Sequence, residues 1–128
     1  MGELEMKRFL GLLLVAVSMA TSLVLAHGNT KPLHGGVIQF VGETSFELVA
    51  KPDGAEVYVV EDGEDISSAE MTAKLTVDSG GAKSEAVLQP AGGNKFEAKG
   101  VKITSGAKVV VQLVGANQTK TTARFTMK

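Results

Sequence analysis

The chain has 128 residues, a length that suits a single domain. Its 13 lysines and arginines nearly balance 14 aspartates and glutamates, which argues against a nucleic-acid-binding surface because such surfaces carry a clear basic excess. There is no cysteine, and this excludes a disulfide scaffold, a thiolate metal site, a thiol nucleophile and a lipidated cysteine. The 15 glycines, spread along the chain, predict many tight turns.

Residues 1–26 have the pattern of a secretory signal peptide. Lys7 and Arg8 form a basic start, an apolar run follows from residue 9 to residue 25, and a small-residue cleavage site ends at Ala26. We therefore expect a periplasmic protein that is secreted through a cleaved signal peptide and keeps no stable membrane span. An uncleaved membrane anchor is the alternative, but the apolar run is shorter than the ~20 residues of a spanning helix and contains polar serine and threonine.

Beyond residue 36 the sequence is divided by turn signals. Stretches rich in Gly, Asp, Asn and Pro occur at residues 41–43, 51–54, 61–65, 79–81, 91–94, 105–106 and 115–118. The runs between them are rich in Val, Thr, Phe, Ile and Leu, a spacing typical of an all-β domain rather than of alternating strands and helices. We predict a single small antiparallel β-sandwich over residues 37–128, immunoglobulin-like or cupredoxin-like, with about 7–9 strands.

Several of these runs alternate apolar and polar side chains, the pattern of a strand with one buried face. The residues expected to face the core are Phe46, Leu48, Ala50, Leu75, Val77, Phe96, Ala98, Ala123, Phe125 and Met127. The runs at 55–62 and 107–115 are more continuously apolar, which favours central strands. Residues 64–71 are expected to form a turn or loop, because the segment is too short for a stable helix.

Motifs of enzyme active sites are missing from the sequence. It contains no G-x-S-x-G nucleophile motif, no phosphate-binding G-x-x-x-x-G-K-[ST] loop and no H-E-x-x-H zinc motif. The carboxylates cluster in the predicted turns rather than in a pattern that suits acid–base catalysis. We therefore expect that the chain is not an enzyme.

Both histidines of the chain, His27 and His34, fall in residues 27–36, which we interpret as a flexible leader. Cleavage after Ala26 gives His27 a free α-amine, and this amine and the ring Nδ1 can close a six-membered chelate on a metal ion. Both groups can lose their protons near neutral pH. With the imidazole of His34, the three nitrogen donors favour Cu(II) and also accommodate Zn(II). The alternative is a polar N-terminal segment that binds no ligand.

Two further features supply auxiliary candidates for a metal site. The acidic turn holds Glu61, Asp62, Glu64 and Asp65, whose oxygens are ligands of hard cations, although their spacing is not that of an EF-hand. Met71 carries a thioether, a soft ligand that suits copper. The competing interpretation is a solvated hairpin tip for the acidic residues and a gap-filling core position for Met71.

The segments KPLHGGVIQFVGETSFELVA, DGAEVYVVEDGEDI, AKLTV, KSEAVLQPAGGNKFEAKG and ARFTMK resemble a group of small secreted bacterial proteins. They are also similar to the amino-terminal β-domain of periplasmic adaptor subunits of heavy-metal efflux pumps, in which an H-G-G element leads into a strand. Here His34, Gly35 and Gly36 carry that match. The resemblance implies a periplasmic protein that handles copper or a zinc-class cation and works with an efflux-pump component.

Two functions are consistent with these observations. The first is a non-enzymatic periplasmic protein that binds copper or zinc as an accessory of metal efflux, with His27 and His34 as ligands. The second is a metal-free structural or interaction module of the cell envelope, which would offer its sheet edge or its leader to a partner.

Overall fold

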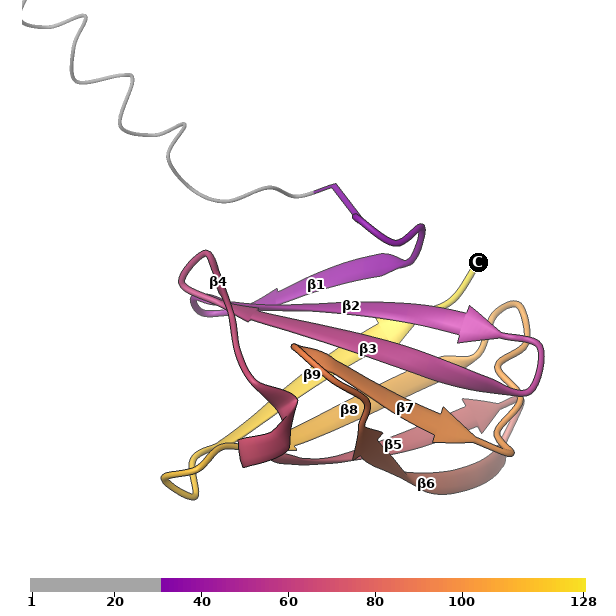
Figure 1. Ribbon diagram of the computed structural model, residues 1–128. Coiled ribbons are helices and arrows are strands. Elements are labelled where there is room, and N and C mark those ends of the chain that lie inside the picture. The colour runs from indigo at the N-terminus through magenta and orange to yellow at the C-terminus, as the bar shows by residue number, and fades with distance from the viewer. Residues whose placement is uncertain (1–30) are drawn as a thin grey trace, which may run out of the picture.

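The computed structural model describes residues 31–128, so the predicted signal peptide and His27 lie outside the described part (Figure 1). This part contains nine strands, namely β1 Val37–Val41, β2 Thr44–Lys51, β3 Gly54–Glu61, β4 Glu64–Asp65, β5 Thr72–Ser79, β6 Ala82–Pro90, β7 Lys95–Lys99, β8 Lys108–Val114 and β9 Lys120–Thr126. A single 3-10 turn, η2 at Ser68–Glu70, lies between β4 and β5. Within these residues no helix is long and apolar enough to cross a bilayer. The prediction of an antiparallel all-β domain is confirmed.

The strands form one antiparallel sheet in the order β1-β2-β3-β7-β6-β5-β8-β9, and β4 pairs with the end of β3. Strands β5, β6 and β7 follow one another, and β8 then returns to lie beside β5, which is a Greek-key connection. Strand β6 belongs to both halves of the sheet, because most of it pairs with β5 while Gln89 and Pro90 pair with β7. The sheet curls until β1 and β9, at the two ends of this order, lie near each other (Figure 1). The two layers of the predicted sandwich are therefore parts of one continuous sheet.

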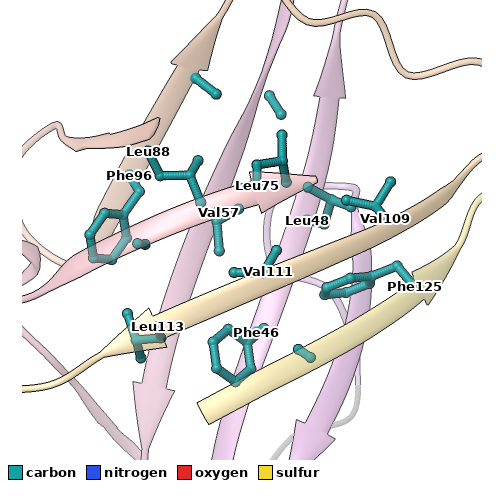
Figure 2. Close-up of a cluster of buried hydrophobic side chains, with 14 of the residues drawn as sticks. Phe46, Leu48, Val57, Leu75, Leu88, Phe96, Val109, Val111, Leu113 and Phe125 are labelled. Carbon is teal, nitrogen blue, oxygen red and sulfur yellow. The ribbon is translucent and has the colours of Figure 1, made fainter. Parts of the chain in front are cut away.

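The core lies between these layers (Figure 2). Large apolar side chains from seven strands are almost completely buried there, namely Phe46, Leu48, Val57, Leu75, Leu88, Phe96, Val109, Val111 and Phe125. Most of the predicted core residues are confirmed, and Met127 is half-buried against the cluster. Ala50 is an exception and is exposed, because β1 pairs with β2 only as far as Leu48 and leaves Ala50 at an open edge of the sheet.

The outer face of β1, β2 and β3 positions the candidate site. Residues directly opposite each other on neighbouring strands point to the same face of a sheet. The register therefore aligns Ile38, Glu47 and Tyr58 in one row on this face. A second row holds Phe40, Ser45 and Val60.

Candidate functional site

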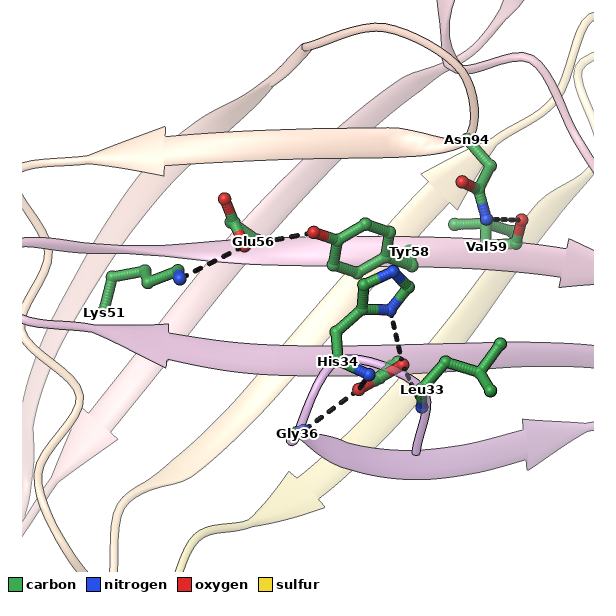
Figure 3. Close-up of polar contacts among 9 residues, drawn as sticks. Leu33, His34, Gly36, Lys51, Glu56, Tyr58, Val59 and Asn94 are labelled. Atoms are coloured by element: carbon green, nitrogen blue, oxygen red, sulfur yellow. Dashed lines mark hydrogen bonds and ion pairs between the residues drawn. The ribbon is translucent and has the colours of Figure 1, made fainter. Parts of the chain in front are cut away.

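Glu47 lies on the outer face of β2, yet its side chain is only 7% exposed, because residues 33–36 fold back across it. Its carboxylate accepts hydrogen bonds from the backbone N–H groups of Leu33 at 3.1 Å, His34 at 2.8 Å and Gly36 at 2.9 Å. The ring Nδ1 of His34 lies 2.9 Å from Oε1 of the same carboxylate (Figure 3). We call Leu33, His34, Gly36 and Glu47 together the leader clasp. A carboxylate has about four lone-pair sites, so Glu47 is saturated with donors.

The sequence predicts that residues 27–36 form a flexible leader, but the leader clasp fixes residues 33–36 of this segment. Residues 33–36 are held against β2, because the buried Glu47 supplies the acceptors that their N–H groups need. The sequence alone gives no sign of this, since the partner lies on a strand 13 residues beyond His34. His27 lies outside the described residues.

Gly35 and Gly36 allow the leader to approach β2 closely. Gly35 has a φ of 76°, a conformation that glycine adopts without strain. A Cβ on Gly36 would overlap the backbone carbonyl oxygen of Leu48 and lie 2.9 Å from Cγ2 of Val49. A larger residue at position 36 would therefore push the leader away from Glu47. The H-G-G sequence meets the steric requirement of this approach.

The His34 imidazole is oriented on two sides. An ionised carboxylate only accepts hydrogen bonds, so the contact with Glu47 places a proton on Nδ1. The ring also stacks on Tyr58, with the two centroids 3.6 Å apart and the planes 2° from parallel. Nε2 has no hydrogen-bond partner among residues 31–128, and the side chain is 40% exposed. In the neutral ring, Nε2 therefore carries a lone pair that the fold leaves unused.

Glu56 on β3 holds the Tyr58 hydroxyl and is itself paired with lysines of β2 and β7. The Tyr58 hydroxyl donates a hydrogen bond of 3.2 Å to Glu56, which also pairs with Lys51 at 3.6 Å (Figure 3). Lys95 lies 3.7 Å from the other carboxylate oxygen of Glu56. Burial raises the pKa of Tyr58 above 10.0, and the negative charge and hydrogen bond of Glu56 raise it further. The phenol therefore stays neutral at physiological pH and continues to donate to Glu56.

The pKa of Glu47 results from two opposing effects. Burial of the carboxylate by itself raises the pKa, because it disfavours the charged form. Hydrogen bonds from the His34 ring and from the N–H groups of Gly36, His34 and Leu33 favour the charged form, and their sum outweighs burial. The pKa of Glu47 is thus lower than its ordinary value of 4.5, and the carboxylate is ionised at neutral pH.

A groove of about 430 Å³ runs over this face, between the leader and the β3–β4 hairpin. Its floor is formed by the two outward rows of β1 to β3, including Ile38, Phe40, Tyr58 and Val60. His34 lines the groove as well. The following residues complete the lining: Lys31, Leu33, Glu43, Ser45, Glu47, Gly63, Asp65 and Asn94.

The structure divides the auxiliary metal candidates between two grooves. Asp65 lines the same groove as His34, whereas Glu61, Asp62 and Glu64 stand exposed on the β3–β4 hairpin. Met71 is 7% exposed, packs in the core and lines a different groove, which Glu61 also lines. Among the described residues there is no group of three or more His, Cys, Asp or Glu side chains placed to hold a metal ion.

Sequence reasoning missed Glu47 and Tyr58 as partners of His34. Alternation within the run 45–50 does place Glu47 on the solvent side of its strand. Tyr58 joins it only through the pairing of β2 with β3, and the leader joins both only through its reversal at Gly35. Two features of the sequence mark these residues: Tyr58 is the single tyrosine of the chain, and Glu47 is a lone glutamate between large apolar residues. No sequence motif links the two positions, so their contact with His34 could not be predicted.

Comparison with models of known protein families gives no match for this chain, and comparisons with curated proteins and with solved structures also give none. The resemblance to efflux-pump adaptors therefore rests on the quoted sequence segments alone. Function has to be argued from the chemistry of the site, because a fold by itself does not imply an activity.

Proposed function

We propose that this domain binds a transition-metal ion, Cu(II) or Zn(II), through His34 and His27, and serves without catalysis as a periplasmic carrier or accessory of metal efflux. The observation that carries the proposal is the contact between His34 Nδ1 and Glu47. Metal-binding histidines commonly donate their second ring N–H to a carboxylate, which fixes the ring and makes the free nitrogen a better donor. The His34–Glu47 pair has this arrangement, with Nε2 available.

One imidazole is not a metal site, so further donors have to come from elsewhere. His27, the first residue after the predicted cleavage site, would add its α-amine and its imidazole. An extended chain spans about 3.3–3.6 Å per residue, so the residues between His27 and the leader clasp are long enough to fold back to His34. Asp65, on the same groove, is a candidate oxygen ligand.

The test is a titration with Cu(II) and Zn(II) of the protein that begins at His27, beside a synthetic peptide of residues 27–36. Because Glu47 orients His34, the domain is expected to bind about 10–100-fold more tightly than the peptide. His34→Phe keeps an aromatic ring against Tyr58 but removes both nitrogens, and one extra alanine before His27 removes the amine chelate. Each change should weaken binding by at least about 10-fold.

Glu43→Gln is the matched control, since Glu43 is an exposed glutamate on the same groove that lies outside the leader clasp. It should bind metal as the unchanged protein does. Affinity no higher than that of the free peptide, or equal affinity in the His34→Phe protein, would show that the fold contributes no metal site.

A metal-free interaction module of the cell envelope is the second candidate. It is favoured by the exposure of Leu33 and Phe40 beside the groove, 73% and 47% respectively. The same titration separates the two, because an interaction module has no reason to bind metal more tightly than its isolated leader.

A further inference from the structure

We propose that the groove between the leader and the β3–β4 hairpin is a docking site for an extended peptide segment of a partner protein, in which basic residues alternate with apolar ones. This proposal is independent of the metal site, because it rests on the shape and charge of the groove rather than on Nε2 of His34.

Exposed apolar side chains line the groove. Four large hydrophobic side chains are exposed within residues 31–128, and two of them, Leu33 and Phe40, line this groove, whereas Val41 points to the opposite face of β1. Val87, on β6, is the fourth. Contiguous exposed apolar groups of this kind mark interaction surfaces more often than scattered ones do.

The charge of the groove complements a basic peptide. Glu43 and Asp65 line the groove, and the adjoining hairpin adds the exposed carboxylates of Glu61, Asp62 and Glu64. Lys31 also lines the groove, and the charge of Glu47 is already engaged by the leader clasp. The balance on this rim is acidic, which favours a lysine or arginine over an acidic side chain. The exposed face of Phe40 offers a further contact to a cation.

The floor of the groove matches the spacing of side chains in an extended peptide. A volume of about 430 Å³ accommodates a few side chains rather than a folded element. Along β1 the outward side chains Ile38 and Phe40 are two residues apart, which is also the spacing of alternate side chains in an extended peptide. Apolar side chains of such a peptide would cover this floor while its basic side chains reach the rim.

The test uses three blocked hexapeptides in which phenylalanine alternates with lysine, glutamine or glutamate. Each is titrated into the 15N-labelled protein beginning at His27, with EDTA present so that metal plays no part. The lysine peptide is expected to give saturable amide shifts at Ile38, Phe40, Val60 and Asp65, and to bind more weakly as salt is raised. The glutamate peptide should bind least.

Variants locate the contact. Phe40→Ala, at an exposed position, should weaken the lysine peptide about five-fold or more. Glu43→Gln combined with Asp65→Asn should abolish the preference for lysine over glutamine. Val87→Ala and Glu85→Gln on β6 are the matched controls and should change nothing.

Equal binding of the three peptides, shifts confined to other strands, or no saturation would overturn the proposal. So would line broadening that grows with protein concentration in the absence of peptide, which assigns the surface to self-association, or binding to phospholipid vesicles in its place. His27→Ala should leave the peptide affinity unchanged, so failure of the metal site and failure of this docking site are told apart.

Discussion

Replacing Glu47 by glutamine is expected to release residues 33–36 from the sheet. The carboxylate of Glu47 faces four donors, three backbone N–H groups and the Nδ1–H of His34. A glutamine amide offers one oxygen that can accept, and its NH2 group would point two hydrogens at the remaining donors. The isosteric substitution therefore keeps the volume of the side chain and removes the leader clasp.

The magnitude follows from two opposing terms. Hydrogen bonds to a charged group contribute ~1.5–3 kcal/mol each. Ordering the backbone of residues 33–36 costs ~1–2 kcal/mol per residue. With four such bonds and four ordered residues, the middle of both ranges leaves a net contribution of about 3 kcal/mol for the leader clasp, a large part of the ~5–15 kcal/mol that stabilises an ordinary domain.

Two measurements check this prediction. Denaturant unfolding of Glu47→Gln should show a loss of about 3 kcal/mol, while Glu43→Gln should stay within ~0.5 kcal/mol. Amide hydrogen exchange should show that Leu33, His34 and Gly36 are protected in the unchanged protein and lose protection in Glu47→Gln, with the strands less affected. If these amides exchange equally in both proteins, or if the two variants lose the same stability, the reasoning about Glu47 is refuted.

Three further predictions follow from the same structure. Gly36→Ala should destabilise the protein by about 1–3 kcal/mol, because its Cβ overlaps the Leu48 carbonyl, and its effect should not add to that of Glu47→Gln in a double-mutant cycle of unfolding free energies. Since the pKa of Glu47 is lower in the folded state, the unfolded chain takes up the Glu47 proton first as pH falls. The leader clasp should therefore stabilise the fold fully above the ordinary pKa of 4.5, and this stabilisation should be lost as pH drops through the lower pKa of the folded state. A pH series of amide exchange at His34 should show this loss, and Glu47→Gln should show no such step. Leu75→Ala should cost about 2–5 kcal/mol in thermal or denaturant unfolding, because the side chain is fully buried, whereas Val87→Ala, at an exposed position, should change stability by less than ~0.5 kcal/mol.

Strand positions could be predicted because they depend on local properties of the chain. The alternation of Phe46, Glu47 and Leu48 assigns inner and outer faces whatever lies opposite, since successive side chains of a strand point to opposite sides. Turn glycines mark strand ends in the same way: Gly42 and Gly63, with φ of 61° and 81°, separate β1 from β2 and β3 from β4.

The order of the strands could not be predicted in this way. That β3 pairs with β7, and that β6 is divided between β5 and β7, depends on how distant segments pack, and many arrangements would satisfy the same alternation. The error at Ala50 has a similar origin, because the pattern marks a face and does not show that the pairing of β1 with β2 stops at Leu48.

His34 shows most clearly which properties come from the sequence and which come from the tertiary structure. Its residue type and its place before two glycines were enough to make it a candidate ligand, since imidazole chemistry belongs to the residue itself. Its proton position, its stacking on Tyr58 and its attachment to a buried Glu47 depended on the pairing of β2 with β3 and on the reversal of the leader over them. These are contacts between residues far apart in the chain, and only the folded backbone brings their atoms within hydrogen-bonding distance.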